Sequence, residues 1–163
     1  MCRIGILLVV LLWLPPLEQA PGPTMPLPTK PVLTLDVARR VAAAAEAEAA
    51  RNNWAVAIAV LDDAGHLVVF HRMDGAKLVA IDIAIRKART AVYFQGPTKA
   101  LEEEVAGGRT ALLPIDGFMP LEGGVPLVVD GRMVGAVGVS GVAENQDAQC
   151  SLAGAKALTR GSL

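Results

Sequence analysis

The sequence contains few aromatic residues, few cysteines and almost no net charge. Two tryptophans, one tyrosine and three phenylalanines occur in 163 residues, which is too few to build stacking platforms for nucleotide bases. A formal net charge of −1 gives no electrostatic basis for binding nucleic acid. Two cysteines, Cys2 and Cys150, cannot form a disulfide scaffold. The hydrophobic fraction of 53% excludes a disordered chain, and the length indicates one domain.

An apolar run follows Arg3 and covers residues 4–14. It is shorter than the about 20 residues that cross a bilayer, and it is typical of a secretory signal. We therefore predict a signal peptide at 1–20, a proline-rich leader at 21–31, a domain at 32–158 and a tail at 159–163. The mature product is then periplasmic or secreted, with no stable membrane insertion. The alternative is translation from Met25, which gives a cytoplasmic product.

The remaining chain alternates between helical and strand periodicity. Thr34 is a predicted N-cap for a helix that ends at Asn52-Asn53. Asp130-Gly131 separates two apolar runs and predicts a tight hairpin, because both turn positions need positive φ. Pro126 cannot donate a ladder hydrogen bond, so it belongs at a strand start or an edge. Strands are expected at 55–61, 66–72 and on both sides of the hairpin, and helices at 78–94, 99–106 and 145–158.

Strands joined by hairpins, with the helices gathered in blocks, predict an α+β fold. We expect a single domain with a five-stranded antiparallel sheet flanked by helices. Both faces of the 55–61 strand are apolar, so both faces of the sheet should be covered. Ile83 lies on the polar side of its helix, and we expect it at a contact with another subunit.

Few side chains are candidates for chemistry. His66 and His71 point to opposite faces of one strand, so they cannot share a metal ion. The glycines of the 135–141 segment lie at the end of a hairpin with the wrong spacing for a dinucleotide site. Lys87 lies beside the apolar stripe of its helix, where it would hold a carboxylate or propionate group. The alternatives for Lys87 are a snorkelling side chain and an internal ion pair with Glu122.

Four motifs in order carry a resemblance to a known family: Asp82-Ile83-Ala84-Ile85-Arg86-Lys87-Ala88-Arg89-Thr90-Ala91, Pro97-Thr98, Leu121-Glu122-Gly123-Gly124-Val125-Pro126 and Gly135-Ala136-Val137-Gly138-Val139-Ser140-Gly141. Together they make the chain similar to the GlcG/HbpS family of haem-binding proteins. The same domain ends some corrinoid adenosyltransferases. The resemblance covers residues 31–157 and implies a five-stranded antiparallel sheet and large homo-oligomers, often octamers.

The resemblance also implies a function. Secreted members of the family bind haem, can degrade it and store iron, and act as redox-sensing accessories to sensor kinases. The chain departs from the family at two places. Phe118 occupies the position of a haem-ligating threonine, and Asp82 and Ile85 occupy the positions of two iron-binding glutamates.

The sequence supports two functional hypotheses and a third without a ligand. In the first, the protein is an exported, oligomeric haem-binding protein whose pocket has Arg86, Lys87 and the Glu122-Gly123-Gly124 turn as its polar rim. His71 and Met119 are then the candidate axial ligands, since Phe118 cannot ligate iron. In the second, the protein is an isomerase or lyase for a small carboxylic acid, in which Glu122 or His71 acts as acid or base and Lys87 holds the carboxylate. The third is a non-catalytic oligomeric scaffold.

Overall fold

The structure is a computed structural model, and it describes residues 25–158. The predicted signal peptide and tail, and the first residues of the leader, lie outside the described residues. Within them, every predicted helix and hairpin is present with its boundaries shifted by a few residues. The elements in chain order are α1 (Leu35–Arg51), β1 (Ala57–Asp62), β2 (Leu67–Arg72), α2 (Val79–Tyr93), α3 (Thr98–Ala106), a 3₁₀ turn (Thr110–Leu112), β3 (Gly124–Val129), β4 (Arg132–Ser140) and α4 (Glu144–Ala157).

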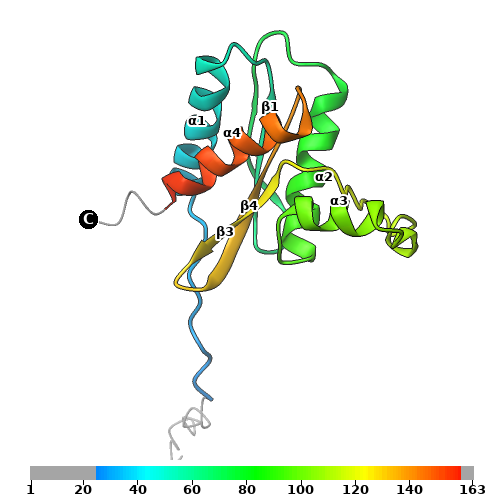
Figure 1. Cartoon of the computed structure of the whole chain (residues 1–163). Coiled ribbons are helices and arrows are strands. Elements are labelled where there is room, and N and C mark those ends of the chain that lie inside the picture. The colour runs from blue at the N-terminus through cyan, green and yellow to red at the C-terminus, as the bar shows by residue number, and fades with distance from the viewer. Residues whose placement is uncertain (1–24, 159–163) are drawn as a thin grey trace, which may run out of the picture.

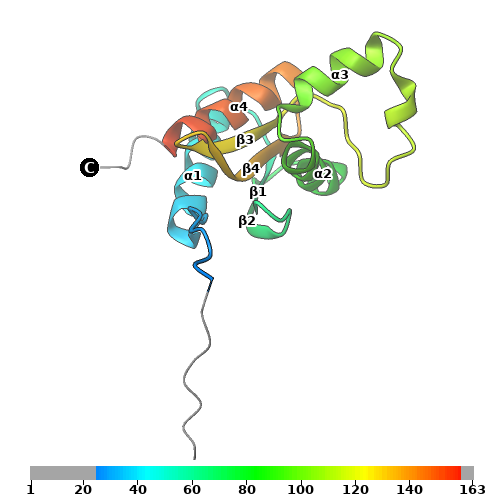
Figure 2. The ribbon, with the colours of Figure 1, turned by 90° about the horizontal axis from the view of Figure 1, so that it is seen from below.

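The sheet of the described residues has four antiparallel strands in the order β2-β1-β4-β3. The predicted fold class is confirmed, but the expectation of five strands is wrong. The chain between α3 and β3 makes no strand, because Pro114 and Pro120 lack the N–H that a ladder needs and Gly108 and Gly117 have positive φ. This segment forms a long loop instead, which extends with α3 away from the sheet (Figure 2).

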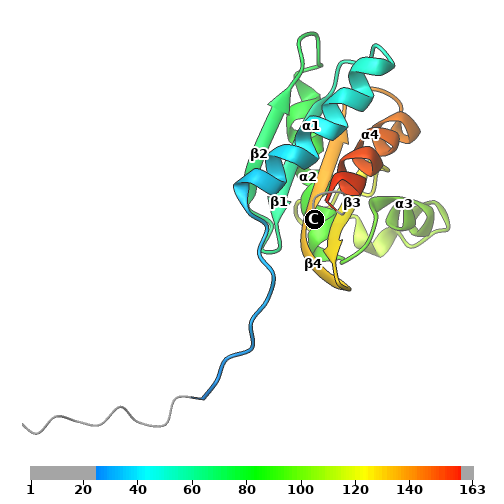
Figure 3. The ribbon, with the colours of Figure 1, turned by 90° about the vertical axis from the view of Figure 1, so that its left-hand side faces the viewer.

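Helices cover both faces of the sheet, as the apolar strand pattern predicted. Helices α1 and α4 lie side by side on one face, and α2 lies on the other (Figures 1 and 3). Val56, Ile58 and Val60 point toward α1 and α4, while Ala57 and Ala59 point toward α2. No helix among residues 25–158 is long and apolar enough to cross a membrane.

Helix α2 packs unusually close to the sheet because small residues face each other. Ala80, Ala84 and Ala88 are fully buried against the alanines of β1. A Cβ atom at Gly138 of β4 would lie 2.2 Å from the carbonyl oxygen of Ala84. The glycine therefore serves the close packing of α2 on the sheet.

The β3–β4 hairpin follows the sequence prediction. Asp130 and Gly131 form its turn with φ of 49° and 73°. Pro126 lies in β3, which is an edge strand, so its missing N–H costs no bond to a further strand. The hairpin places the Gly123-Gly124 turn at the start of one edge strand and Ser140 at the end of the neighbouring strand.

Candidate functional site

A buried ion pair joins α2 to α4. The Nζ atom of Lys87 lies 2.8 Å from Oδ2 of Asp147, and both side chains are 2% exposed. Lys87 also donates to the carbonyl oxygen of Val139 at 3.2 Å, and the other carboxylate oxygen of Asp147 accepts from the N–H of Val142. Burial raises the pKa of Asp147, and the charge of Lys87 offsets part of this rise. Of the interpretations offered for Lys87, the structure shows an internal ion pair, but its partner is Asp147 and not Glu122.

The Gly123-Gly124 turn packs against this ion pair. The carbonyl oxygen of Gly123 accepts from Oγ of Ser151 at 2.5 Å, and the N–H of Gly124 donates to Oγ1 of Thr98 at 2.9 Å. Gly123 has a φ of +125°, and a Cβ atom there would lie 2.9 Å from Nζ of Lys87. Motifs that are far apart in the sequence thus meet in one polar cluster of Lys87, Thr98, Gly123, Gly124, Asp147 and Ser151, which we call the α2–α4 knot.

Glu122 lies next to the knot but at the surface. Its carboxylate pairs with Nζ of Lys99 at 3.2 Å, and its N–H donates to Oε2 of Glu102 at 2.8 Å. The hydrogen bond to Glu122 raises the pKa of Lys99. These contacts hold the loop before β3 against α3.

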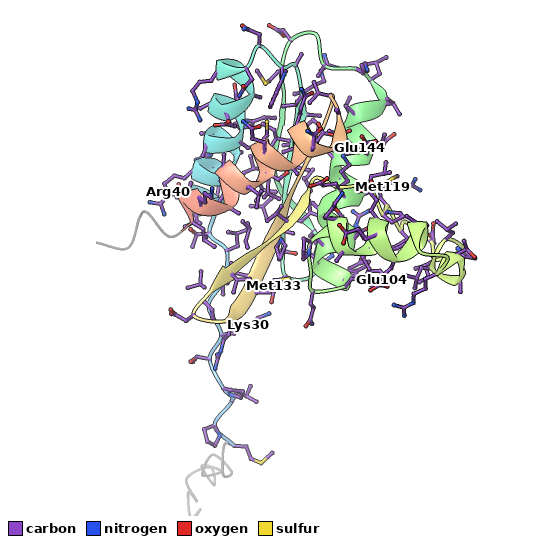
Figure 4. The ribbon with its side chains drawn as sticks, viewed as in Figure 1. Lys30, Arg40, Glu104, Met119, Met133 and Glu144 are labelled. Carbon is purple, nitrogen blue, oxygen red and sulfur yellow. The ribbon has the colours of Figure 1, made fainter. Side chains whose placement is uncertain are left out.

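Phe118 and Met119 lie in the same loop, which also packs on α2. The ring of Phe118 contacts the ring of Phe94, with centroids 5.1 Å apart. The N–H of Met119 donates to Oγ1 of Thr90 at 2.9 Å. Both side chains remain partly exposed. Figure 4 shows Met119 on the side of the molecule that carries α2 and α3.

A small cavity lies between the start of α2 and the start of α4. Its volume is about 170 Å³. Lys87 and Asp147 line it from one side, and Ser140 lines it from the end of β4. Glu144 lies at its margin, where α4 begins beside α2 (Figure 4). Ile83, the expected subunit contact, is half-buried in the cavity wall.

The outer face of α2 carries a second, open hollow of about 380 Å³. Its lining contains the single carboxylate of Asp82 with Ile85, Arg86 and Arg89. Arg86 is exposed there. It directly precedes Lys87 in the sequence, but its side chain lies on a different side of α2. Among residues 25–158 no group of three or more His, Cys, Asp and Glu side chains is arranged to hold a metal ion.

His71 is not brought together with the other candidates. It lies on β2, at the opposite edge of the sheet from the Gly123-Gly124 turn. Its Nδ1 atom lies 2.6 Å from Oε2 of Glu46 on α1. Since α1 and α2 cover opposite faces, His71 and Met119 of one chain cannot ligate the same iron.

The sequence prediction missed three members of the knot: Thr98, Asp147 and Ser151. Thr98 begins α3, and Asp147 and Ser151 are buried in α4 beside Ala148, Cys150 and Gly154. The signal in the sequence is weak but present: two polar residues four apart share the face that carries the small apolar residues of this helix. A buried carboxylate at such a position needs a cation from elsewhere in the chain.

Comparisons with known proteins point to one family. Residues 33–156 match the family model described as haem degrading protein HbpS-like. Protein GlcG of Escherichia coli K12 is 49% identical over 112 residues, which are 69% of this chain and 84% of GlcG. The crystal structure of HbpS matches with a TM-score of 0.74 and 36% identity over 80% of this chain and 92% of that one. A PduOC–haem complex matches with a TM-score of 0.72 and 28% identity over 78% and 96%.

Proposed function

Because this chain belongs to the family of HbpS-like proteins, we propose that it is an exported protein that binds haem as a homo-oligomer. The observation that carries the proposal is the family match over nearly the whole domain, together with a related structure that is a haem complex. Export rests on the apolar run at residues 4–14. We also propose that it degrades the haem that it binds. A direct role in iron storage is disfavoured, because the hollow on the outer face of α2 contains a single carboxylate, that of Asp82.

The surface around α2 and the following loop supports a site that a second copy completes. Leu78, Val79, Leu113 and Ile115 are large apolar side chains, and 46–75% of each is exposed. Phe118 and Met119 lie in the same loop as Leu113 and Ile115. The cavity at the knot, at about 170 Å³, is below the about 300–1,000 Å³ of typical ligand sites. A haem bound there would need walls from two copies of the chain.

The side chains of this surface fit the chemical demands of haem. The thioether of Met119 is a known type of axial ligand, and Phe118 beside it offers an apolar face to the ring. Arg86 is exposed on α2 and is our candidate for a propionate contact. The amine of Lys87 is already paired with Asp147, so we assign it to the support of the Glu122-Gly123-Gly124 turn. Bound haem supplies a redox-active iron, and the residues named here bind and orient it.

Titration with haem, followed by its Soret absorption, tests this proposal. We expect saturable binding, with a band position that changes in Met119→Ala because the axial ligand is lost. His71→Ala tests the alternative axial ligand. If the Soret band position changes in His71→Ala and not in Met119→Ala, the iron is bound at the β2 edge of the sheet. Arg86→Ala should lower the affinity and leave the band position unchanged, since a propionate contact does not touch the iron. If haem does not bind saturably, the proposal is wrong.

Assembly has its own test. Ile83→Glu places a charge on α2 beside the exposed Val79, which is costly if a second copy covers this surface. We expect sedimentation velocity to show an oligomer for the parent chain and smaller species for Ile83→Glu. A monomeric parent at micromolar concentration would contradict the proposal of a subunit-lined site.

A further inference from the structure

The outer face of α2 carries a continuous stripe of polar and apolar side chains. Helix α2 lies on the side of the sheet opposite α1 and α4, and its outer face is turned away from the sheet (Figure 2). Because an α-helix turns by about 100° per residue, residues three, four and seven apart share one face. The residues of this face run from one end of the helix to the other, and we call them the α2 stripe: Leu78, Asp82, Ile85, Arg86, Arg89 and Tyr93.

The apolar residues of the stripe are placed symmetrically. Leu78 is 75% exposed and Tyr93 is 61% exposed. Leu78 lies seven residues before Ile85, and Tyr93 lies seven residues after Arg86. Ile85 is half-buried in the middle, where the stripe has the open hollow of about 380 Å³ described above. A single exposed apolar residue is ordinary on a protein surface, but this spacing makes the two halves of the stripe mirror each other in position.

The charges follow the same symmetry with opposite sign. Asp82 lies three residues before Ile85, and Arg89 lies three residues after Arg86. The side chains of Asp82 and Arg86 are exposed and make no hydrogen bond or ion pair with any of residues 25–158. Arg89 donates from Nε to the carbonyl oxygen of Gly65 at 3.4 Å, which fixes its direction and leaves its two terminal nitrogens available. The stripe therefore has an acid in one half and a base at the matching position of the other half.

We propose that two copies of this chain pack α2 against α2 in antiparallel orientation, about a two-fold axis near Ile85. In a two-fold contact, residue i of one copy meets residue j of the other, and j meets i. Leu78 then lies beside the partner's Tyr93, and Asp82 lies beside the partner's Arg89, so that each contact occurs twice. Ile85 meets the partner's Ile85 at the hollow, which removes its exposed apolar surface from water.

Arg86 lies at the margin of this contact. Ile85 and Arg86 flank the line through Asp82 and Arg89 on opposite sides, because each is about 50° away from it around the helix. The two Arg86 side chains therefore meet on the solvent side, where their charges are screened, and they stay accessible for the propionate contact proposed above. The inference rests on the homo-oligomer of the proposed function, to which it assigns one specific interface, and it does not depend on haem.

Two charge reversals test the contact in the full chain. Asp82→Arg places an arginine beside the partner's Arg89, and Arg89→Asp places two acids together. Each variant alone should self-associate at least about tenfold more weakly than the parent, because both ion pairs become like-charge pairs. An equimolar mixture of the two variants restores an opposite pair at both positions, so it should recover association to within about threefold of the parent. Asp36→Arg, on the opposite side of the sheet in α1, is the matched control and should assemble as the parent does. Sedimentation velocity measures all four samples.

Cross-linking locates the axis. Ile85→Cys places a thiol beside its own counterpart, so mild oxidation should give a disulfide-linked dimer in high yield. Arg89→Asp in the same chain should lower this yield. Asn145→Cys is the control, because Asn145 is exposed at the start of α4, outside the α2 stripe. Cys2 is replaced by Ser in every sample, and the natural Cys150 is fully buried.

Three results would overturn the inference while leaving the homo-oligomer in place: a charge reversal that assembles as the parent does, a mixture of the two variants that recovers nothing, and Ile85→Cys that gives no more dimer than Asn145→Cys. In each case the parent still assembles through a different surface, so this failure is distinguishable from failure of the proposed function. A monomeric parent would overturn both. A parent that assembles as expected but does not bind haem would overturn only the proposed function.

Discussion

The buried ion pair between Lys87 and Asp147 gives a quantitative prediction. Lys87→Met keeps most of the volume of the side chain but leaves Asp147 without its cation at a position that is 2% exposed. Removing one partner of a buried pair costs about 3–5 kcal/mol of unfolding free energy, out of a usual total of about 5–15 kcal/mol. We expect this loss at about pH 8, where the folded chain must either bury the unpaired carboxylate or hold a proton that the unfolded chain has released.

The loss should depend on pH, with a definite sign. An unfolded Asp releases its proton near pH 3.9, whereas burial raises the pKa of Asp147 in the folded chain. Removing Lys87 takes away the charge that now lowers this pKa, so it rises further. Between the two pKa values the folded state holds more protons than the unfolded state, and its stability therefore falls as pH rises, by up to about 1.4 kcal/mol per unit. Lys87→Met should consequently be less destabilised at about pH 5 than at about pH 8.

A second substitution makes the test specific. Asp147→Asn in the Lys87→Met background removes the unpaired charge and keeps an oxygen for the N–H of Val142, so it should recover at least about 2 kcal/mol at about pH 8. Lys99→Met is the matched control, since its ion pair with Glu122 involves a lysine that is 47% exposed, and it should cost less than about 1 kcal/mol. Urea unfolding at both pH values gives these numbers. A loss below about 1 kcal/mol in Lys87→Met, or no recovery by Asp147→Asn, would refute the reasoning.

Two further predictions concern packing and the buried thiol. Gly138→Ala should lower the free energy of unfolding by about 1–3 kcal/mol or more, because the new Cβ atom meets the backbone of α2 at 2.2 Å. Gly96→Ala is the control in the same urea assay. It should be tolerated, because its new Cβ atom has no contact closer than 3.8 Å. Burial raises the pKa of the Cys150 thiol to about 12, so an alkylating reagent should modify it at neutral pH only in denaturant, as peptide mass spectrometry can show; rapid modification of the native chain would contradict this. Above about pH 9 the unfolded chain loses this proton first, so stability should fall with rising pH more steeply in the parent than in Cys150→Ala.

Much of the fold could be predicted because local signals agreed with each other. Thr34 caps α1 as expected, and the Asp130-Gly131 turn joins β3 and β4. The expectation of a fifth strand was wrong, because the local signals in the loop before β3 conflict with one another. The loop before β3 carries apolar residues such as Ile115, but its prolines and positive-φ glycines prevent pairing.

The candidate site was predicted less completely, because its members come from distant parts of the chain. The helical stripe of α2 indicated that Lys87 reaches a partner, but nothing near it in sequence identifies Asp147, which is 60 residues away. Ser140 lines the cavity beside the knot, and this position depends on the register between β4 and β1. Such a position follows from tertiary packing alone, which periodicity does not encode.

The central claim is that an oligomer of this chain binds haem, and co-sedimentation tests it most directly. The purified protein is mixed with haem and sedimented while absorption is followed both in the Soret band and in the protein band. The account predicts that both signals move together as a species larger than the 17.0 kDa chain, and that Met119→Ala alters the Soret position. Protein that sediments as a monomer without Soret absorption would contradict the account.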